Sequence, residues 1–487
     1  MKARQLLLAL VTVGLVSCQG SRVSQADIQC EADLKGHTVA VMAATYYDTK
    51  FTKTEGVQVF RVNAEADGLL AVRQGLADAF VTDEVLFTKE DLDRKGFKKA
   101  CSGDEQFPCS IAFQKGDTVL LPAFNRFLAQ MREDGSLEAY GKYWIENGPE
   151  VPDPQPAEAV DGKPIRYIAA MTTAPISFLR NGVWTGLDAD LIRRFAIWYG
   201  RPLEANDIPF ASAILALQTG KADIVSGCLF PTDERRTHVD FSDPYYMCRP
   251  GIFVVSDDVP EGVLLWERVK GVIRQSFLIE RRWKLIADGL GVTVLITLLS
   301  ILLGTLLGAG FCAMKLGRRK WMRKTADLYG AFMQGVPTLV LLLIMFYVVF
   351  VDTNFGAIYV AVITFALGFA SSSGSVFAAS IKAVPIGQWE AGYALGLSKT
   401  ATFRHIVFPQ ALRTSIGPYT GHCIALLKGT SIVGYIAVQD LTRASDLLRA
   451  RTFEAFMPLL AITVMYFVLA WLLRLLLNLA VPKKQYD

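Results

Sequence analysis

The chain has 487 residues, of which 52% are hydrophobic and 20% are charged. This composition is too apolar for a wholly soluble protein and too polar for a chain that lies entirely in a membrane, so two unlike parts are expected. The formal net charge of +4 is too small to suggest nucleic-acid binding, and four scattered histidines predict no metal site.

The amino terminus, residues 1–18, is typical of an export signal. Lys2 and Arg4 precede an apolar stretch from Leu6 to Val16, as in secretory signals. The ending Leu-Val-Ser-Cys resembles a bacterial lipoprotein box, in which Cys18 is lipidated and becomes the mature terminus. Ordinary cleavage and an uncleaved anchor are the alternatives. In each case the residues that follow are expected outside the cytoplasm.

Cysteines in the exported region are candidates for disulfides, because an oxidising compartment lets them persist. Cys101 and Cys109 are close in sequence, and Cys228 and Cys248 are more loosely spaced. Each of these pairs is a candidate disulfide. Spacing alone does not establish the geometry, so unpaired thiols remain the alternative.

Two segments repeat one pattern. Residues 69–81 read LLAVRQGLADAFV and residues 214–226 read ILALQTGKADIVS, and each combines an apolar helical face, a glycine stop and a β-rich run. Strands are expected at 38–42, 57–62, 166–170 and 251–255, with an amphipathic helix at 187–198. This alternation predicts two α/β lobes with parallel sheets. A Pro-rich stretch, 148–164, is interpreted as the linker between them, and a cleft between such lobes is a natural ligand site.

The two segments resemble the solute-binding proteins of the polar amino acid type. In the second segment, PISFLRNGVWTGLDADL, ALQTGKADIVSG and TDERRTHVDFSDPYY are similar to the first lobe of that family. In the first segment, DLKGHTVAVMAAT, GLADAFVTDEV and FQKGDTVLLPAFNRFLAQMREDGSLEAYGKYW are similar to its second lobe. The resemblance implies a periplasmic-binding-protein-like domain that is circularly permuted, with residues 27–147 as lobe two and 165–262 as lobe one. Two separate truncated domains are the alternative.

The resemblance also implies three ligand-binding residues. Arg235, in TDERR, would grip a ligand carboxylate with its planar fork of donors. Asp83 matches the family aspartate that holds an α-ammonium group, and Thr45 would offer a hydroxyl and a backbone N–H to the carboxylate. A solvated charge or a helix cap is the alternative for each. The surrounding sequence departs from the family pattern at Ala44, Tyr46, Thr172, Thr173, Phe230 and Pro231. The solute's side chain therefore stays open.

Residues 284–482 predict an all-α membrane domain of about five transmembrane helices. Residues 289–314, 328–351 and 353–381 carry no charge, and each is long enough to cross the bilayer core. Further spans are expected near 415–438 and 455–477. The fourth contains Lys428, which is costly in lipid and should face the bundle interior or an interface. A place in the solute pathway, snorkelling and helix pairing are the alternatives for this lysine.

The orientation of the spans follows from their loops. Residues 315–324 carry six basic residues and no acid, which favours the cytoplasm. With five spans, the 382–413 loop is then also cytoplasmic and residues 19–284 lie outside, in agreement with the export signal. The sequence therefore predicts a multi-pass protein of the bacterial cytoplasmic (inner) membrane with an extracytoplasmic binding domain.

Residues 385–411 resemble the EAA loop of ABC importer permeases. The matching residues in EAGYALGLSKTATFRHIVFPQALR are Glu390, Ala391, Gly396 and Pro409. The resemblance implies a short coupling helix that docks in a groove of an ATP-binding subunit, and GLGVTVLITLLSILLGTLLG and LLKGTSIVGYIAVQDL point to the amino acid uptake branch. A generic amphipathic loop is the alternative.

No catalytic constellation is recognised, and the phrase nearest to a phosphate-binding loop, GYALGLSKT, has the wrong spacing. The prediction is a non-enzymatic, fused solute-binding and permease subunit of an ABC importer for a small polar solute, with an amino acid as the default. This chain is expected to hold no cofactor, because ATP and Mg would bind a partner ATP-binding subunit dimer. A pore requires a second permease copy, as a homodimer or with a paired permease. A ligand-gated ion channel and a non-transporting solute sensor are the alternatives.

Overall fold

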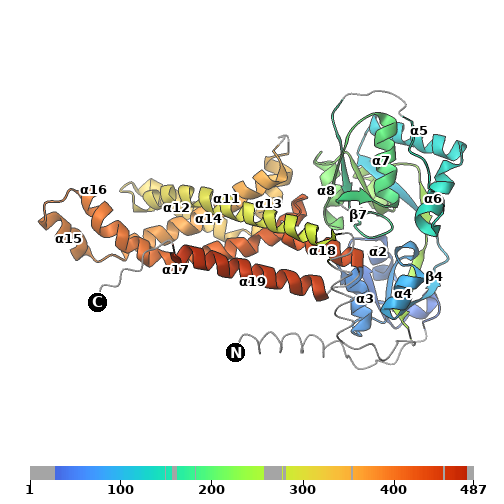
Figure 1. The fold of residues 1–487 in the computed structure, drawn as a ribbon, viewed down its shortest axis with the longest axis horizontal. Helices are drawn as coiled ribbons and strands as arrows, with labels where there is room; N and C mark the ends of the chain where they lie inside the picture. The colour runs from blue at the N-terminus through green and yellow to red at the C-terminus, as the bar shows by residue number, and fades with distance from the viewer. Residues whose placement is uncertain are drawn as a thin grey trace. The chain divides into compact units, whose positions relative to one another are not determined.

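The computed structural model describes residues 28–148, 150–155, 162–180, 182–256, 277, 281–351, 355–452 and 456–479. The predicted signal segment, with Cys18, lies outside these residues. The chain divides into two compact units: Met1–Arg282 with Asp446–Pro458, and Trp283–Ser445 with Leu459–Asp487. Figure 1 shows strands and helices in the first unit and helices in the second. The α/β and all-α classes predicted for the two parts are thereby confirmed.

A five-stranded sheet forms the amino-terminal lobe of the first unit. Its order is β2-β1-β3-β13-β4, in which β1 runs parallel to β2 and β3 while β13 is antiparallel to β3 and β4. The strands are β1 (Thr38–Met42), β2 (Gln58–Val62), β3 (Ala79–Asp83), β4 (Phe97–Ser102) and β13 (Pro250–Val255). The helices of this lobe are α2 (Tyr46–Lys53), α3 (Glu65–Arg73) and α4 (Lys89–Lys95). Every residue of β3 is buried, because β1 and β13 flank the strand on its two sides. The sheet is mixed, so the prediction of a parallel sheet is only partly correct.

A six-stranded sheet forms the central lobe. Its order is β11-β5-β10-β6-β9, and β12 also pairs with β5. The strands are β5 (Phe107–Gln114), β6 (Ile165–Ala169), β9 (Leu203–Asp207), β10 (Ile224–Leu229), β11 (Val239–Phe241) and β12 (Tyr246–Cys248). The helices are α5 (Leu120–Glu133), α6 (Ser136–Glu146), α7 (Leu187–Tyr199), α8 (Ala213–Gln218) and α9 (Asp233–Arg236). A separate hairpin joins β7 (Phe178–Arg180) to β8 (Val183–Thr185).

The two sheets exchange strands across the predicted lobes 27–147 and 165–262. Strand β5, from the first range, pairs with β10 in the central lobe, whereas β13, from the second range, pairs with β3 in the amino-terminal lobe. The chain thus crosses between the lobes twice, once on entering β5 and once between β12 and β13. We call β5, β12 and β13 the hinge strands. Composition cannot assign strands to lobes, because strand pairing is non-local and decides which lobe each strand joins.

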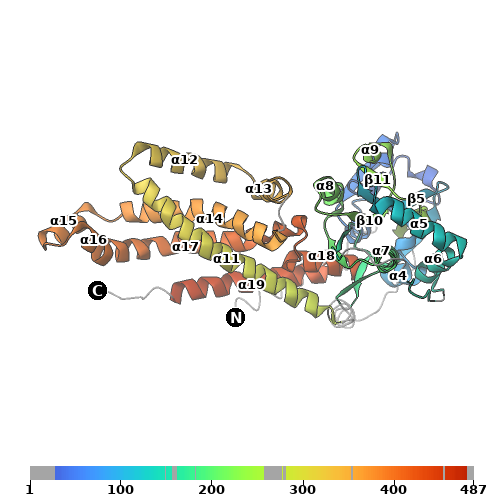
Figure 2. The ribbon, with the colours of Figure 1, turned by 90° about the horizontal axis from the view of Figure 1, so that it is seen from above.

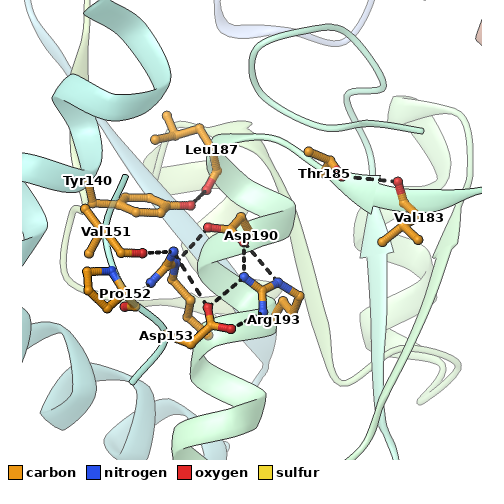
Figure 3. A network of polar contacts seen from close by, with 10 residues as sticks. Tyr140, Val151, Pro152, Asp153, Val183, Thr185, Leu187, Asp190 and Arg193 are labelled. Carbon is orange, nitrogen blue, oxygen red and sulfur yellow. Dashed lines mark hydrogen bonds and ion pairs between the residues drawn. The ribbon is translucent and has the colours of Figure 1, made fainter. Parts of the chain in front are cut away.

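The described part of the Pro-rich linker is held against α7 (Figure 3). The guanidinium of Arg194 donates to the Asp190 carboxylate at 2.7 Å and to both carbonyl oxygens of Val151–Pro152 at 2.6 Å. Arg193 donates to the carboxylate of Asp153 at 3.0 and 3.2 Å. Because Arg194 is buried, Val151 and Pro152 are packed against α7.

The second unit contains only helices in its described residues (Figure 2). They are α11 (Trp283–Leu316), α12 (Lys320–Gly335), α13 (Thr338–Ile344), α14 (Ala357–Lys382), α15 (Ile386–Ala394), α16 (Lys399–Thr402), α17 (Phe408–Gly429), α18 (Leu441–Thr452) and α19 (Phe456–Leu479), of which α18 extends into the first unit. A π-helical turn, Met345–Val349, continues α13. Another π-helical turn, Phe403–Val407, precedes α17, and a 3-10 helix, Thr430–Ile436, follows it.

Among the described residues, three helices are long and apolar enough to cross a membrane: Trp283–Leu316, Ala357–Lys382 and Met457–Leu479. The number rises to five if each of two bent helix pairs counts as one span. The predicted span 328–351 belongs to one such pair, because α12 and α13 meet at 102°. Pro337 stands at this bend and lacks the N–H that a continuous helix needs. The predicted span 415–438 belongs to the other pair, which bends by 54° before α18.

Glycines bring α11 close to α14. A Cβ atom at Gly304 would lie 2.8 Å from the carbonyl oxygen of Ala366, and one at Gly308 would lie 2.1 Å from Oγ of Ser373. The hydroxyl of Ser373 donates to the Gly304 carbonyl at 3.2 Å across the same contact. These two glycines therefore permit close helix packing, as small residues do in membrane bundles. A Cβ atom at Gly310 would meet nothing within 4 Å.

Candidate functional site

Arg235 joins the two lobes of the first unit. It lies on α9, whose first turn is capped by the Thr232 hydroxyl. Its guanidinium donates to the Phe230 carbonyl at 3.1 Å in the central lobe and to the Ala44 carbonyl at 3.0 Å in the amino-terminal lobe. The group also lies over the Phe210 ring, 5.5 Å from its centroid. Burial lowers the pKa of Arg235 from its ordinary value. A guanidinium carries five N–H donors, more than these two bonds use.

Asp83 ends β3 and is buried in the amino-terminal lobe. Its carboxylate accepts a hydrogen bond of 2.6 Å from the Tyr47 hydroxyl. Burial raises the pKa of Asp83 to about 7, and the nearby acids Glu65 and Asp188 add to this effect while the Tyr47 bond opposes it. A carboxyl in this state gains from a cationic partner, because a positive charge would favour its ionised form.

Thr45 caps the amino terminus of α2. Its hydroxyl accepts from the Asp48 N–H at 3.4 Å and donates to the Met42 carbonyl at 2.6 Å. Its backbone N–H also points to the Met42 carbonyl, at 3.4 Å. The hydroxyl and the backbone N–H of Thr45, which were expected to bind a ligand carboxylate, are therefore both bonded within the loop. The adjacent residue, Ala44, supplies the carbonyl that Arg235 reaches and has a left-handed φ of 63°.

A chain of aromatic contacts leads from Asp83 to Arg235. Tyr46 lies 4.4 Å from Phe107 and 5.7 Å from Phe230, measured between ring centroids, and Phe107 lies 5.2 Å from Phe230. Tyr47, which binds Asp83, makes an edge contact with Phe230 at 6.0 Å. We call Tyr46, Tyr47, Phe107 and Phe230 the aromatic cluster. Sequence reasoning recognised Tyr46 and Phe230 only as departures from the family pattern, and it missed Tyr47 and Phe107.

A second polar contact crosses between the lobes. The Thr173 hydroxyl, in the central lobe, donates to Oε2 of Glu65 at 3.0 Å, and both side chains are buried. Oε1 of Glu65 is buried and has no hydrogen-bond partner. Burial raises the pKa of Glu65, while its own backbone N–H and Thr173 oppose the shift. In the sequence, the two threonines of MTTAPISF stood out only as a departure from the family pattern, and no pattern singled out Glu65.

All seven cysteines in the described residues are free in this structure, so the two candidate disulfides stay predictions. Cys101 lies on β4, opposite Ile252 of β13, and stays outside the cluster that contains Cys109. Strands β4 and β5 belong to different sheets, which separates two residues that are close in sequence. Cys109, Cys228 and Cys248 instead lie together at the hinge strands.

The predicted coupling loop consists of α15, α16 and the start of α17. Glu390 and Ala391 are exposed on α15, and Gly396 ends the helix with φ of 77°, a conformation that favours glycine. Pro409 is the second residue of α17, directly after the π-helical turn Phe403–Val407. Apolar side chains at both ends of α15 are also exposed, with Ile386 at 73% and Leu395 at 77%.

The loop is nevertheless held in one shape. A Cβ atom at Gly392 would lie 2.4 Å from Cγ2 of Thr402, so α15 and α16 pack together through this glycine. The Trp389 and Phe403 rings stack with centroids 6.2 Å apart, and the Ser398 hydroxyl caps α16. An ordered helix therefore presents a charge and exposed apolar residues, which is the chemistry of a docking surface.

Lys428 lies near the end of α17 and is exposed. The bundle interior, one of its two predicted environments, does not contain it in this single chain. Gly417, Gly421 and Ala425 precede it at intervals of three or four residues, and all are exposed. Such spacing places them on one face of the helix together with the lysine. This face is open in one copy of the chain.

The comparisons with known proteins fall into two groups. The family described as "Bacterial extracellular solute-binding proteins, family 3" matches residues 165–410, a stretch that begins at β6 of the central lobe. The probable amino-acid ABC transporter permease protein YckA of Bacillus subtilis (strain 168) is 32% identical over 170 residues, which are 35% of this chain and 75% of that protein.

Two further relatives carry transport names. The L-cystine transport system permease protein TcyB of Bacillus subtilis (strain 168) is 31% identical over 209 residues, or 43% of this chain and 86% of that protein. The arginine ABC transporter permease protein ArtQ of Haemophilus influenzae (strain ATCC 51907 / DSM 11121 / KW20 / Rd) is 34% identical over 165 residues, or 32% of this chain and 74% of that protein. Each match leaves more than half of this chain uncovered.

Proposed function

Because the chain belongs to the bacterial extracellular solute-binding proteins of family 3 and to the amino-acid ABC transporter permeases, we propose that one polypeptide both captures its solute and conducts it through the membrane. It is a fused solute-binding and permease subunit of an ABC importer for amino acids. The two-lobed unit is the receptor, and the helical unit contributes the pore. A ligand-gated channel would not account for permease relatives that match through most of their length.

The solute site lies between Arg235 and Asp83. An α-amino acid carries a carboxylate and an ammonium group, which a guanidinium and a carboxylate bind with charge-assisted hydrogen bonds. The observation that carries this proposal is their linkage: Asp83 binds Tyr47, Tyr47 packs on Phe230, and the Phe230 carbonyl accepts from Arg235. The aromatic cluster would enclose the apolar part of the solute between these charges. Thr45 contributes by shaping the loop that presents the Ala44 carbonyl.

The binding unit is a circular permutation of the family fold. Its chain begins in the amino-terminal lobe, enters the central lobe in β5 and returns in β12–β13, so two crossings connect the lobes. The family match starts at residue 165, where the second segment begins. The linker then joins what would be the original ends, and Arg194 holds it on α7. Joined ends that lie close together at a surface make such a rearrangement tolerable.

The permease unit requires two kinds of partner. The exposed face of α15, with Glu390, is the surface for an ATP-binding subunit, which would hold ATP and Mg and perform hydrolysis. The exposed face of α17, with Gly421 and Lys428, is the surface for a second permease copy, because burial in an interface would remove the lysine from lipid. The binding unit lies outside the cytoplasmic (inner) membrane, and the coupling loop lies inside.

Reconstitution tests the proposal directly. The full chain is placed in liposomes with its ATP-binding subunit, and uptake of radiolabelled amino acids is measured with ATP supplied on the coupling-loop side. We expect uptake that requires ATP, the ATP-binding subunit and solute on the opposite side. Solute-dependent ion conductance by the chain alone would instead support a channel, and solute binding without uptake would support a sensor.

A further inference from the structure

Three cysteine side chains meet where the hinge strands cross between the lobes. They come from β5 (Cys109), β10 (Cys228) and β12 (Cys248), and their sulfur atoms all lie within 4.8 Å of one another. The Cys109 and Cys248 sulfurs are 2.6 Å apart, and those of Cys228 and Cys248 are 3.6 Å apart. All three are buried. We call them the hinge cysteines.

The surroundings of the hinge cysteines disfavour charge on sulfur. Burial raises the pKa of Cys109 and of Cys248 well above the ordinary value, and the Asp83 carboxylate adds to both shifts. A thiolate-bound metal would require these sulfurs to lose their protons. A disulfide bears no charge, so these surroundings favour it over a metal bound by thiolates, and the 2.6 Å separation of the Cys109 and Cys248 sulfurs points to this pair.

We propose that Cys109 and Cys248 form a disulfide that crosslinks the two hinge strands, with Cys228 as a third sulfur that can exchange into it. The proposal rests on the extracytoplasmic location of this unit under the proposed function, because disulfides persist there. On formation, the two thiols lose two protons and two electrons to a thiol–disulfide oxidoreductase or a small-molecule disulfide. That oxidant is reduced to two thiols.

The crosslink would act on the hinge. In the antiparallel pairing of β5 and β12, Cys109 faces Tyr246 and Cys248 faces Phe107, so the bond would run diagonally between the strands. Phe107 belongs to the aromatic cluster of the solute site. A bond between Cys109 and Cys248 would therefore hold the register of the strands about which the lobes close on the solute.

Cys228 offers an exchange partner. Its thiolate would attack Sγ of Cys248, forming a Cys228–Cys248 bond and breaking the Cys109–Cys248 bond, after which Cys109 leaves as a thiolate and takes a proton. Cys228 has a left-handed φ of 46°, uncommon for a residue with a side chain, and its N–H donates to Asp188 at 3.3 Å. Phe230 lies two residues after Cys228, and its carbonyl accepts a hydrogen bond from Arg235. Exchange at Cys228 would therefore couple the loop of the solute site to the hinge strands.

Peptide mapping of the full-length chain tests the pairing. The protein is purified without reductant, alkylated in denaturant, digested and analysed by mass spectrometry. We expect a Cys109–Cys248 crosslink that persists in Cys101→Ser and in Cys228→Ser, and a Cys228–Cys248 crosslink in Cys109→Ser. Alkylation of both Cys109 and Cys248, a Cys101–Cys109 crosslink, or a bound thiophilic metal with three reduced thiols would each overturn the proposal.

A second measurement separates the pairing from the location. Fully reduced, purified protein is treated with oxidised glutathione, which supplies the oxidant whatever the compartment of the unit. We expect the same Cys109–Cys248 crosslink to form. If the crosslink forms with oxidised glutathione but is missing from protein purified from cells without reductant, the extracytoplasmic location is contradicted. If oxidised glutathione does not produce the crosslink, the proposed pairing is wrong.

Thermal unfolding adds a physical readout. Cys109 and Cys248 are 139 residues apart in sequence, so a crosslink would close a long loop in the unfolded chain. Reduction of such a crosslink is expected to lower Tm by roughly 5–15 °C for a unit of this size. We expect this shift in the wild type and in Cys101→Ser but not in Cys248→Ser. Equal Tm values in the oxidised and reduced wild type would overturn the proposal.

Discussion

Arg235 and Asp83 have opposite charges and stand on different lobes, yet they share neighbours. Arg235 reaches the amino-terminal lobe through the Ala44 carbonyl, and Asp83 reaches the central lobe through Tyr47 and its contact with Phe230. Each charged group thus depends on the other lobe for part of its surroundings. A solute that binds both groups would gain affinity only when the lobes are together.

Replacement of Arg235 by lysine tests the carboxylate contact. Lysine keeps the positive charge but loses the planar fork, so we expect solute binding to weaken by about 1.5–3 kcal/mol, or roughly 10- to 100-fold in Kd. The measurement is isothermal titration of the purified chain with amino acids. Arg236→Lys is the matched control, because Arg236 is the exposed neighbour on the same helix. Equal affinity of both variants would remove Arg235 from the solute site.

Under the proposed function, Asp83 should make solute binding pH-dependent. Its pKa of about 7 means that the free carboxyl must lose a proton before it can hold an ammonium group at lower pH. We expect Kd to rise by up to about tenfold for each pH unit below 7 and to be constant at pH 7.5–8.5. In Asp83→Asn, binding should be at least ~30-fold weaker and nearly independent of pH between 5 and 8. The exposed Asp104→Asn serves as the control, and an unchanged pH profile in Asp83→Asn would contradict the assignment.

The same carboxyl also affects stability without solute. Its folded-state pKa lies above the unfolded value, so its contribution is fully present below about pH 4 and is lost as the pH rises through 7. The free energy of unfolding should therefore fall with pH over this window, by at most about 1.4 kcal/mol per pH unit from this group. Chemical denaturation at several pH values measures the slope. Asp83→Asn should flatten it, and a steeper slope in that variant would be inconsistent with the raised pKa.

At the scale of elements, the coupling loop combines an exposed helix with a tight internal contact. The exposed face of α15 is available to a partner, whereas Gly392 on the same helix packs against Thr402 of α16. The loop can transmit motion only if these two short helices move as one body. Packing at Gly392, and not only the exposed charge of Glu390, should then determine how well the loop couples.

Gly392→Ala tests the internal contact of the loop. The new Cβ would approach Thr402 to 2.4 Å, and overpacking of this kind costs about 1–3 kcal/mol. We expect solute-stimulated ATP hydrolysis by the assembled transporter to fall at least about fivefold, with solute affinity unchanged. Gly387→Ala is the matched control, because it lies on the same helix in open space. If the two variants hydrolyse ATP equally, the contact has no part in coupling.

Elements with a strong local signal could be predicted from the sequence, and those defined by distant partners could not. The strand at 38–42 and the helix near 187–198 follow from apolar periodicity and agree with β1 and α7. The bend at Pro337 had a local cause as well, but the uncharged run around it favoured one straight span. The lobe assignment of β5 had no local cause, because hydrogen bonds to β10 decide it.

At the scale of the whole molecule, the proposed function requires the two units to work on opposite sides of a membrane. Tags inserted after Gly116, in an exposed turn of the binding unit, and after Lys399, in the coupling loop, test this requirement. In intact spheroplasts we expect the first tag to react with an impermeant reagent and the second to react only after permeabilisation. If both tags react at the same stage, the two units lie on the same side of the membrane, which would contradict the proposed importer.

The exposed face of α17 predicts the assembly state. A leucine at Gly421 would push apart two permease copies that meet through small residues, so we expect the dimer fraction in detergent to fall by at least half. Size-exclusion chromatography with light scattering measures this fraction. Gly310→Leu is the control, because it adds the same side chain at an open position on α11. If the dimer fraction of Gly421→Leu equals that of the Gly310→Leu control, this face of α17 is not the interface.

The sequence by itself determined the two unlike parts and their α/β and helical classes, and it proposed the coupling loop and the roles of Arg235 and Asp83. These depend on composition, local periodicity or short motifs, which neighbouring residues create together. Only the tertiary structure decided which strands form each lobe, that Thr45 caps a helix with its donors already bonded, and that three cysteines meet at the hinge. Strand β5 pairs with β10, and Cys109 meets Cys248, across more than 100 positions of the chain, so strand pairing and burial, not sequence spacing, bring these residues together. The Thr45 cap is local, but only the folded turn shows that its donors are already bonded.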